Sequence, residues 1–192
     1  MARQSNVRQR ILDAALVVLS RPETQMLAQP QVAKEAGIPQ GHLTYYFPRK
    51  ADLLAAVAEC FASRILAEVQ EALGPSFNPT VKADKDRAYA LIERIVTDPA
   101  KGRILLRLSV AADQDEVVRK ALLDGADAVR LLLGNLGGRQ RDEVETVLAM
   151  ATYTGLALHW LLWTDRERPL PNDVVFRTLR AAFERGIVPP ED

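Results

Sequence analysis

The chain of 192 residues carries 25 basic and 25 acidic side chains, and 48% of its residues are apolar. This balance is typical of a globular, soluble protein with one sizeable core, or with a small domain joined to a larger one. No apolar run is long enough to cross a bilayer, so we expect no membrane partner. The single cysteine, Cys60, excludes an internal disulfide and a cysteine-based zinc site. It suits a reducing cytoplasm, where we expect the protein to act.

The neutral net charge hides an asymmetry along the chain. Residues 1–50 hold seven Lys and Arg against three Asp and Glu, whereas the remaining residues carry a small acidic excess. A basic N-terminal segment on an acidic body is what a DNA-binding head on a body that does not bind DNA shows. The excess is modest and has little weight by itself.

The first fifty residues predict three helices. Apolar residues recur at helical spacing from Val7 to Ser20, which predicts a first helix whose apolar face covers the next two. Pro30 and Gly37 bound a short second helix over 31–36. Proline is tolerated in a first helical turn, and glycine accepts the left-handed conformation that ends a helix. Pro39 then opens a third helix that runs to about residue 47.

Two short helices around a tight turn have the geometry of a helix-turn-helix, whose second helix enters the major groove of DNA. The same pattern occurs in ordinary helical proteins, but the solvent side of this second helix favours DNA. It carries hydrogen-bonding groups without negative charge, next to two cations, as base edges and phosphates require. The predicted DNA-contacting residues are Pro39, Gln40, Gly41, His42, Thr44, Tyr45, Tyr46, Arg49 and Lys50.

The rest of the chain predicts helices throughout and no alternating strand. A long helix over 50–73 ends at Gly74-Pro75, and further helices are expected at about 84–98, 100–112, 114–136, 139–164 and 172–185. With the head this makes an all-α chain of about nine helices. We expect a helix-turn-helix DNA-binding domain over 1–48 and an effector-binding and dimerisation domain over 49–192.

The helix predicted over 139–164 is expected to be the longest of the body, and it is apolar nearly all round. Such a helix must be buried on every side, which in a chain this small indicates a partner subunit. With the last helix it would form a four-helix homodimer interface, whereas the alternative is that both helices belong to the core of a monomer. The candidate interface residues are Leu158, Leu161, Leu179 and Phe183.

No catalytic or metal-binding pattern is visible, so we expect a protein that is not an enzyme and has no cofactor and no metal. His42 and His159 are the only histidines, and there is no phosphate-binding glycine loop. Arg103 and Arg107 lie four apart on a leucine-rich helix, where they either hold an anionic effector or pair with carboxylates. His159 and the tryptophans beside it either line a ligand cavity or belong to the core or a dimer interface.

The stretch from Gly37 to Leu54 closely resembles the TetR family of transcriptional regulators. That family typically shows Gly-Val-Ser-x-Gly-x-Leu-Tyr-x-His-Phe, a short gap and then Lys-x-x-Leu. The matching positions include Gly37, Gly41, Leu43, Phe47, Lys50 and Leu53. Thr44 and Tyr46 depart from the usual tyrosine and histidine, and Gln29-Pro30 replaces the usual Thr or Ser before the second helix.

The resemblance implies a ligand-responsive regulator, most often a repressor that binds a palindromic operator as a homodimer and is released by a small, mainly apolar effector. Effector binding would tilt the helix over 50–73 and change the separation of the two recognition helices. If the body packs as in that family, the pocket lies among Phe61, Ile65, Arg103, Leu105, Arg107, Leu122, Tyr153 and His159. An activator, a regulator without an effector, and a small all-α carrier or enzyme with a vestigial head remain alternatives.

Overall fold

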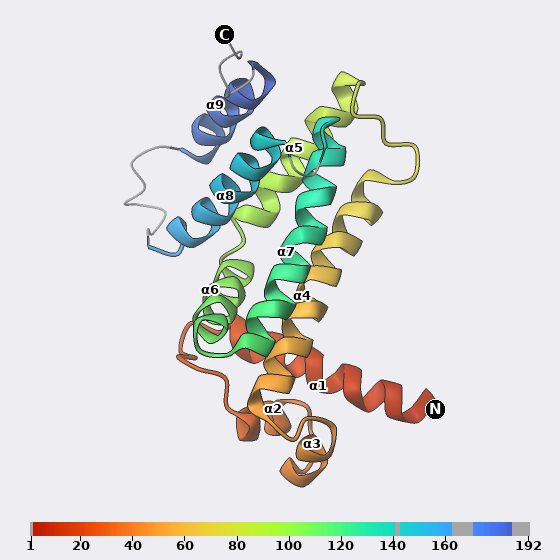
Figure 1. Cartoon of the computed structure of the whole chain (residues 1–192), viewed down its shortest axis with the longest axis vertical. Coiled ribbons are helices and arrows are strands. Elements are labelled where there is room, and N and C mark those ends of the chain that lie inside the picture. The colour runs from red at the N-terminus through yellow and green to blue at the C-terminus, as the bar shows by residue number, and fades with distance from the viewer. Residues whose placement is uncertain (1, 141–142, 163–170, 186–192) are drawn as a thin grey trace. The chain divides into compact units, whose positions relative to one another are not determined.

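The structure is a computed structural model that describes residues 2–140, 143–162 and 171–185. Every regular element in these ranges is an α-helix, which confirms the predicted all-α class. None of these helices has both the length and the apolar character needed to cross a membrane. In chain order they are α1 (Ala2–Ser20), α2 (Gln29–Glu35), α3 (Gln40–Tyr46), α4 (Lys50–Leu73), α5 (Lys82–Val96), α6 (Pro99–Gln114), α7 (Glu116–Gly137), α8 (Val144–His159) and α9 (Asn172–Arg185) (Figure 1).

The helix predicted over 139–164 differs most from the structure. It begins only at Val144 and ends at His159, so α4 and α7 are both longer, and the prediction of the longest body helix is wrong. The physical reason lies before α8. The hydroxyl of Thr146 donates to the carbonyl of Gln140 (2.9 Å), and the N–H of Gln140 donates to the Glu143 carboxylate (2.9 Å). Glu143 has an extended backbone and is the N-cap of α8, so the helix begins only after it. The end predicted at residue 164 lies outside the described residues.

The chain forms two compact units. Unit 1 consists of the residues up to Arg64 together with Ala100–Ala126, and unit 2 consists of Ile65–Pro99 together with the residues from Asp127 onward. The helices α4 and α7 therefore each contribute to both units. The domain boundary predicted after residue 48 divides the chain by function rather than by packing, and it stays a prediction.

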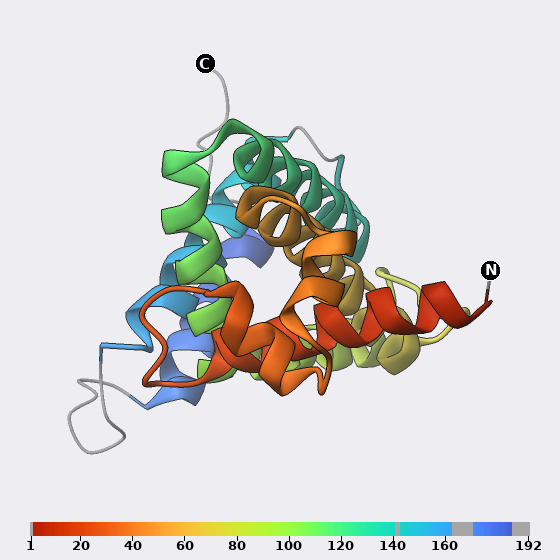
Figure 2. The same cartoon turned by 90° about the horizontal axis from the view of Figure 1, so that it is seen from below.

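A single apolar core joins the three N-terminal helices of unit 1 to α4, α6 and α7. Within it α1 lies against α2, and α2 lies against α3 (Figure 2). Each helix contributes side chains that are almost fully removed from water, among them Ile11, Val32, Leu43, Leu53 and Leu108. Burial of each such side chain stabilises the fold by about 1.5–3 kcal/mol. The α6 helix is thus part of the packing that holds the head.

Unit 2 is held by two smaller clusters. In one, Val69 and Leu73 of α4 pack with residues of α5 and α7. In the other, α5 packs against α8 and α9, around the buried aromatic rings of Tyr153, Trp160 and Phe183. The indole N–H of Trp160 donates to the side-chain oxygen of Asn172 at 2.9 Å. This bond satisfies the polar atom of a buried tryptophan and ties the end of α8 to the start of α9.

Two arginines of α6 hold the C-terminal end of α1. Arg103 donates to the carbonyl of Ser20 at 2.6 Å, and Arg107 donates to the carbonyls of Leu19 and Pro22. The last carbonyls of a helix have no intrahelical donors, so these guanidinium groups supply the missing partners. Burial, and next the charge of Arg103, lower the pKa of Arg107. The sequence predicted that these arginines hold an anionic effector or pair with carboxylates. Their hydrogen bonds go instead to main-chain carbonyls.

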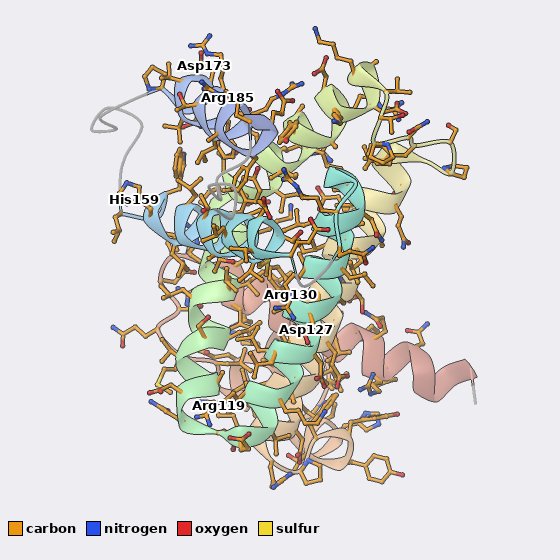
Figure 3. All side chains as sticks on the ribbon, turned by 45° about the horizontal axis from the view of Figure 1, so that its top comes forward. Arg119, Asp127, Arg130, His159, Asp173 and Arg185 are labelled. Atoms are coloured by element: carbon orange, nitrogen blue, oxygen red, sulfur yellow. The ribbon has the colours of Figure 1, made fainter. Side chains whose placement is uncertain are left out.

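An arginine also donates to main-chain carbonyls at the turn between α6 and α7. Arg119 of α7 donates to the carbonyls of Ala112 and Asp113, both at 3.1 Å, and pairs with Glu116 at 2.6 Å (Figure 3). One guanidinium therefore satisfies the last turn of α6 and fixes the direction in which α7 leaves it.

We predict that Arg107→Ala lowers the free energy of unfolding by about 1–3 kcal/mol, because it leaves partly buried carbonyls at the end of α1 without a donor. The measurement is urea unfolding followed by circular dichroism. Arg177→Ala is the matched control, since Arg177 is exposed and its ion pair with Asp173 spans 4.0 Å; its stability should equal that of the wild type. Equal stability of both variants would show that the α6 contact does not hold the head.

Candidate nucleic-acid interface and cavities

The turn between α2 and α3 depends on one glycine. Gly37 has a φ of +63°, in the left-handed region that favours glycine. Its N–H donates to the carbonyl of Lys34 at 3.2 Å, and the N–H of Ile38 donates to the carbonyl of Ala33 at 3.0 Å. This pair of bonds is a Schellman motif, which closes α2 and turns the chain sharply into α3. The predicted helix-turn-helix is therefore present in its expected place.

Side chains that the sequence analysis did not use lock this turn. The amide of Gln29 donates to the carbonyl of Phe47 at 2.8 Å, so the residue that departs from the family pattern ties the start of α2 to the end of α3. Arg10 donates to the carbonyl of Ala36 at 2.7 Å, and the guanidinium of Arg8 lies 5.5 Å from the ring centre of Phe47. Both arginines thus serve the packing of the head.

The outer face of α3 is exposed and uncharged. Leu43 is the buried residue of this helix, which leaves Gln40, Gly41, His42, Thr44 and Tyr45 on the surface. Tyr45 is 72% exposed. Hydrogen-bonding groups that carry no negative charge can approach base edges in the major groove without repelling the phosphates beside them.

Three aromatic rings pack against one another on this helix. The ring centre of Tyr46 lies 5.4 Å from that of His42 and 5.4 Å from that of Tyr45, the latter in a T-shaped arrangement. The hydroxyl of Thr44 donates to the carbonyl of Gln40 at 3.0 Å. Rings packed against one another limit the rotamers of His42 and Tyr45.

The two cations after α3 differ in their surroundings. Arg49 pairs with Asp52 at 2.5 Å. The side-chain hydrogen bond that Arg49 donates to the carboxylate of Asp52 raises the pKa of Arg49 and lowers the pKa of Asp52. Lys50 has no hydrogen bond or ion pair with any described residue. Of the two, Lys50 is the one whose charge is available to a phosphate.

A cavity of about 280 Å³ lies inside unit 2, between α5, α7, α8 and α9. Its walls include Ile92, Leu133, Ala149 and Phe183, and its polar groups come from Lys85, Tyr89, Arg139, Glu145 and Tyr153. Burial raises the pKa of both tyrosine hydroxyls, which therefore stay neutral donors. The hydroxyl of Tyr153 makes no hydrogen bond with the described residues, so it is free to bind a molecule in the cavity.

Only one of the predicted effector residues, Tyr153, lines this cavity. Phe61 and Leu122 pack against the core of unit 1, and Arg103 and Arg107 hold the end of α1. His159 is exposed at the end of α8 (Figure 3). Leu105 and Ile65 are half-buried and also lie outside the lining. The predicted set therefore does not form one site within a unit.

The four predicted dimer residues differ in how far they are buried in their own chain. Phe183 is buried in its own chain, where its ring centre lies 6.0 Å from that of Tyr153, so its side chain is not available to a partner. Leu179 packs partly against the same cluster, and Leu158 and Leu161 are half-buried. A further apolar row of α8 is exposed, and none of the four candidate interface residues belongs to it.

We call this exposed row the α8 stripe; it consists of Val144, Val147, Leu148, Ala151 and Gly155. These positions recur every three or four residues and therefore lie on one side of the helix. A Cβ atom placed on Gly155 would meet no atom within 4 Å, so the backbone itself is open to a neighbour. An apolar row that its own chain leaves uncovered marks a protein contact surface.

The described part of the chain contains no cluster of three His, Cys, Asp or Glu side chains that could hold a metal ion.

Comparison with known proteins points to regulators of transcription. Residues 11–57 match the family model of bacterial regulatory proteins of the tetR family. This segment contains the buried half of α1, the turn, α3 and the first two turns of α4. No curated protein sequence matches the chain.

Solved structures with the same fold extend over nearly the whole chain. A transcriptional regulator from Rhodococcus sp. Rha1 is 19% identical with a TM-score of 0.72, and the match covers 93% of this chain and 94% of that one. A TetR-family member from Streptomyces coelicolor A3 is 23% identical with a TM-score of 0.68, covering 91% and 96%. The multidrug binding protein EbrR in complex with ethidium is 26% identical with a TM-score of 0.69, covering 91% and 97%.

Proposed function

Because this chain is a TetR-family transcriptional regulator by its N-terminal domain and its fold, we propose that it is a repressor. In this proposal it binds a palindromic operator as a homodimer and is released by a small, mainly apolar effector. The observation that carries the proposal is the outer face of α3, which is exposed, uncharged and lies on the second helix of a helix-turn-helix. Such a face has no role in the core of the protein and suits the reading of base edges.

In this function the residues of α3 and the first residue of α4 have two different roles. Gln40 and His42 lie two residues apart near the start of the exposed helix, where recognition helices contact bases, and both can donate and accept hydrogen bonds. Lys50 provides the charge for a phosphate, because Arg49 is already paired with Asp52. Base contacts give sequence preference, whereas the phosphate contact gives affinity for any duplex.

The α8 stripe supports the homodimer. Two copies that meet along this row would bury apolar surface that each copy exposes alone, and Gly155 allows their backbones to approach closely. The contact would be isologous, with the same row on both sides, which generates a closed two-fold dimer. A two-fold dimer presents two recognition helices and therefore requires two half-sites related by the same symmetry.

The cavity of unit 2 supports an effector site. Apolar walls with a few polar groups are the usual composition of a small-molecule pocket. The free hydroxyl of Tyr153 and the carboxylate of Glu145, which has no partner among the described residues, could orient a ligand there. The similar EbrR binds ethidium, an aromatic cation, in one of its crystal structures. An aromatic molecule with a polar or cationic group therefore fits this proposal.

The α7 helix offers a route between the effector and the head. Leu133 and Leu136 of α7 line the cavity, whereas Val118 of the same helix lies in the core that holds the head. In this proposal a ligand in the cavity acts on the head through α7, because this helix contributes residues to both the cavity and the core of unit 1. The sequence analysis assigned this role to α4, whose residues do not line the cavity.

We predict that a pool of random double-stranded DNA, after selection by the protein, yields a sequence with two inverted half-sites. On that sequence Gln40→Ala and His42→Ala should each cost about 1–3 kcal/mol of binding free energy, with a much smaller loss on unselected DNA. The measurement is fluorescence anisotropy at fixed salt. Equal losses on both DNAs would contradict base reading, and failure to select any sequence would contradict the proposed function.

The dimer is tested with two exposed valines of unit 2. Val147 belongs to the α8 stripe and is 41% exposed, whereas Val81 precedes α5 and is 45% exposed. Val147→Asp places a charge in the proposed interface, where it would be desolvated without a partner, and should yield monomers. Val81→Asp should remain dimeric. Sedimentation velocity checks both variants, and a dimer of Val147→Asp with wild-type affinity would exclude the stripe as the interface.

The effector cavity is tested with ethidium as a fluorescent probe, in the absence of DNA. Ala149 lines the cavity, whereas Ala90 is exposed on α5. Ala149→Trp should fill the cavity and weaken saturable ethidium binding about tenfold, which is about 1.4 kcal/mol. Ala90→Trp should bind ethidium as the wild type does. Unchanged binding by Ala149→Trp would place the probe elsewhere.

A further inference from the structure

Unit 1 contains a second hollow that the proposed function does not use. A groove of about 660 Å³ lies between the loop that follows α1, the start of α4 and the outer side of α6. We call it the unit 1 groove. Three of its apolar side chains, Met26, Leu106 and Val110, are large and exposed. It shares no residue with the cavity of unit 2, so the two are separate sites.

The charges in the groove are unevenly matched. Lys50 and Arg107 both line it, and neither pairs with a carboxylate among the described residues. The carboxylate of Asp115 also lies in the lining, but it accepts hydrogen bonds from the N–H groups of Val117 and Val118 at the start of α7. Neither cation is thus held in an ion pair with a described residue, although the charge of Glu23 acts on Arg107, and both lie beside an apolar surface.

The surroundings of Arg107 also favour the binding of an anion. Its hydrogen bonds go to main-chain carbonyls, which satisfy its donors without neutralising its charge. Burial lowers its pKa, and the nearby Arg103 lowers it further. An anion bound beside it would offset both effects, because charge-assisted bonds to guanidinium are stronger than those from neutral acceptors.

We propose that the unit 1 groove binds a small amphipathic anion. The carboxylate would lie at Lys50 and Arg107, and the aliphatic or aromatic body would lie against Met26, Leu106 and Val110. The volume falls in the range of small-molecule pockets, which have apolar walls and a few placed polar groups. A ligand of this kind removes apolar surface from water and places a negative charge against two cations that form no ion pair with the described residues.

The regulatory consequence rests on the proposed function. Lys50 is the cation that we assign to a DNA phosphate, and in the groove the same ammonium would face the bound carboxylate. DNA and the anion therefore compete for one charge at the start of α4. By linkage, each weakens the binding of the other by the same factor. This control acts directly at the head and needs no signal from unit 2.

Titration calorimetry without DNA tests the site itself, with octanoate, octanol and octyltrimethylammonium as probes of equal chain length. Octanoate should bind about tenfold more tightly than octanol, and octyltrimethylammonium should not bind measurably. The matched variants are Val110→Asp and Val117→Asp, at valines that are 48% and 45% exposed, of which only Val110 lines the groove. The first should weaken octanoate binding about tenfold, and the second should leave it within about twofold.

Three results would overturn the proposal. These are the absence of saturable octanoate binding, equal binding of the three probes, and loss of octanoate binding in Ala149→Trp with retention in Val110→Asp. The last result would place the anion in the cavity of unit 2. Because these titrations contain no DNA, they stand even if no operator is found. With a selected DNA in hand, saturating octanoate should weaken its binding about tenfold, and an unchanged affinity would overturn the competition at Lys50.

Discussion

Arginine contacts to the ends of helices hold this protein together. Guanidinium groups from elsewhere in the chain donate to carbonyls at the ends of five helices. Arg103 and Arg107 donate to the end of α1, Arg10 to the end of α2 and Arg87 to the end of α4. Arg119 donates to the end of α6 and Arg139 to the end of α9. The last turn of every helix leaves carbonyls without partners, and each is costly if it is also shielded from water. A chain of short loops has few main-chain donors to offer, so long side chains with several N–H groups fill this role.

The contact from α6 to α1 has the widest consequences. It fixes the end of the helix that packs against α2, and thereby the position of the turn and of α3 in unit 1. It also holds the loop after α1 beside α6, and this loop forms one wall of the unit 1 groove. A molecule that moved α6 would therefore act on the head through hydrogen bonds and packing at once.

The cavity of unit 2 and the unit 1 groove would affect DNA binding in different ways. The cavity in unit 2 is lined by helices that follow the head in the sequence, and in the proposed function a ligand there would act through α7. The unit 1 groove includes the first residue of α4, next to the DNA-facing helix, so a ligand there acts by occupying a charge. A regulator with both sites would answer one signal by a change of shape and another by competition.

The sequence by itself determined the all-α class, the order of the nine helices that the described residues form, the turn at Gly37 and the uncharged face of α3. These features follow from local rules: the period of apolar residues, the helix-ending role of glycine and proline, and a short motif. Only the tertiary structure decided the tasks of Arg103, Arg107 and Gln29 and the burial of Phe183 in its own chain. It also decided the late start of α8. The arginines, Gln29 and Phe183 depend on partners far along the chain, which leave no periodic trace that a single sequence can show. The start of α8 depends on local side-chain bonds of Gln140, Glu143 and Thr146, which the apolar period does not reveal either.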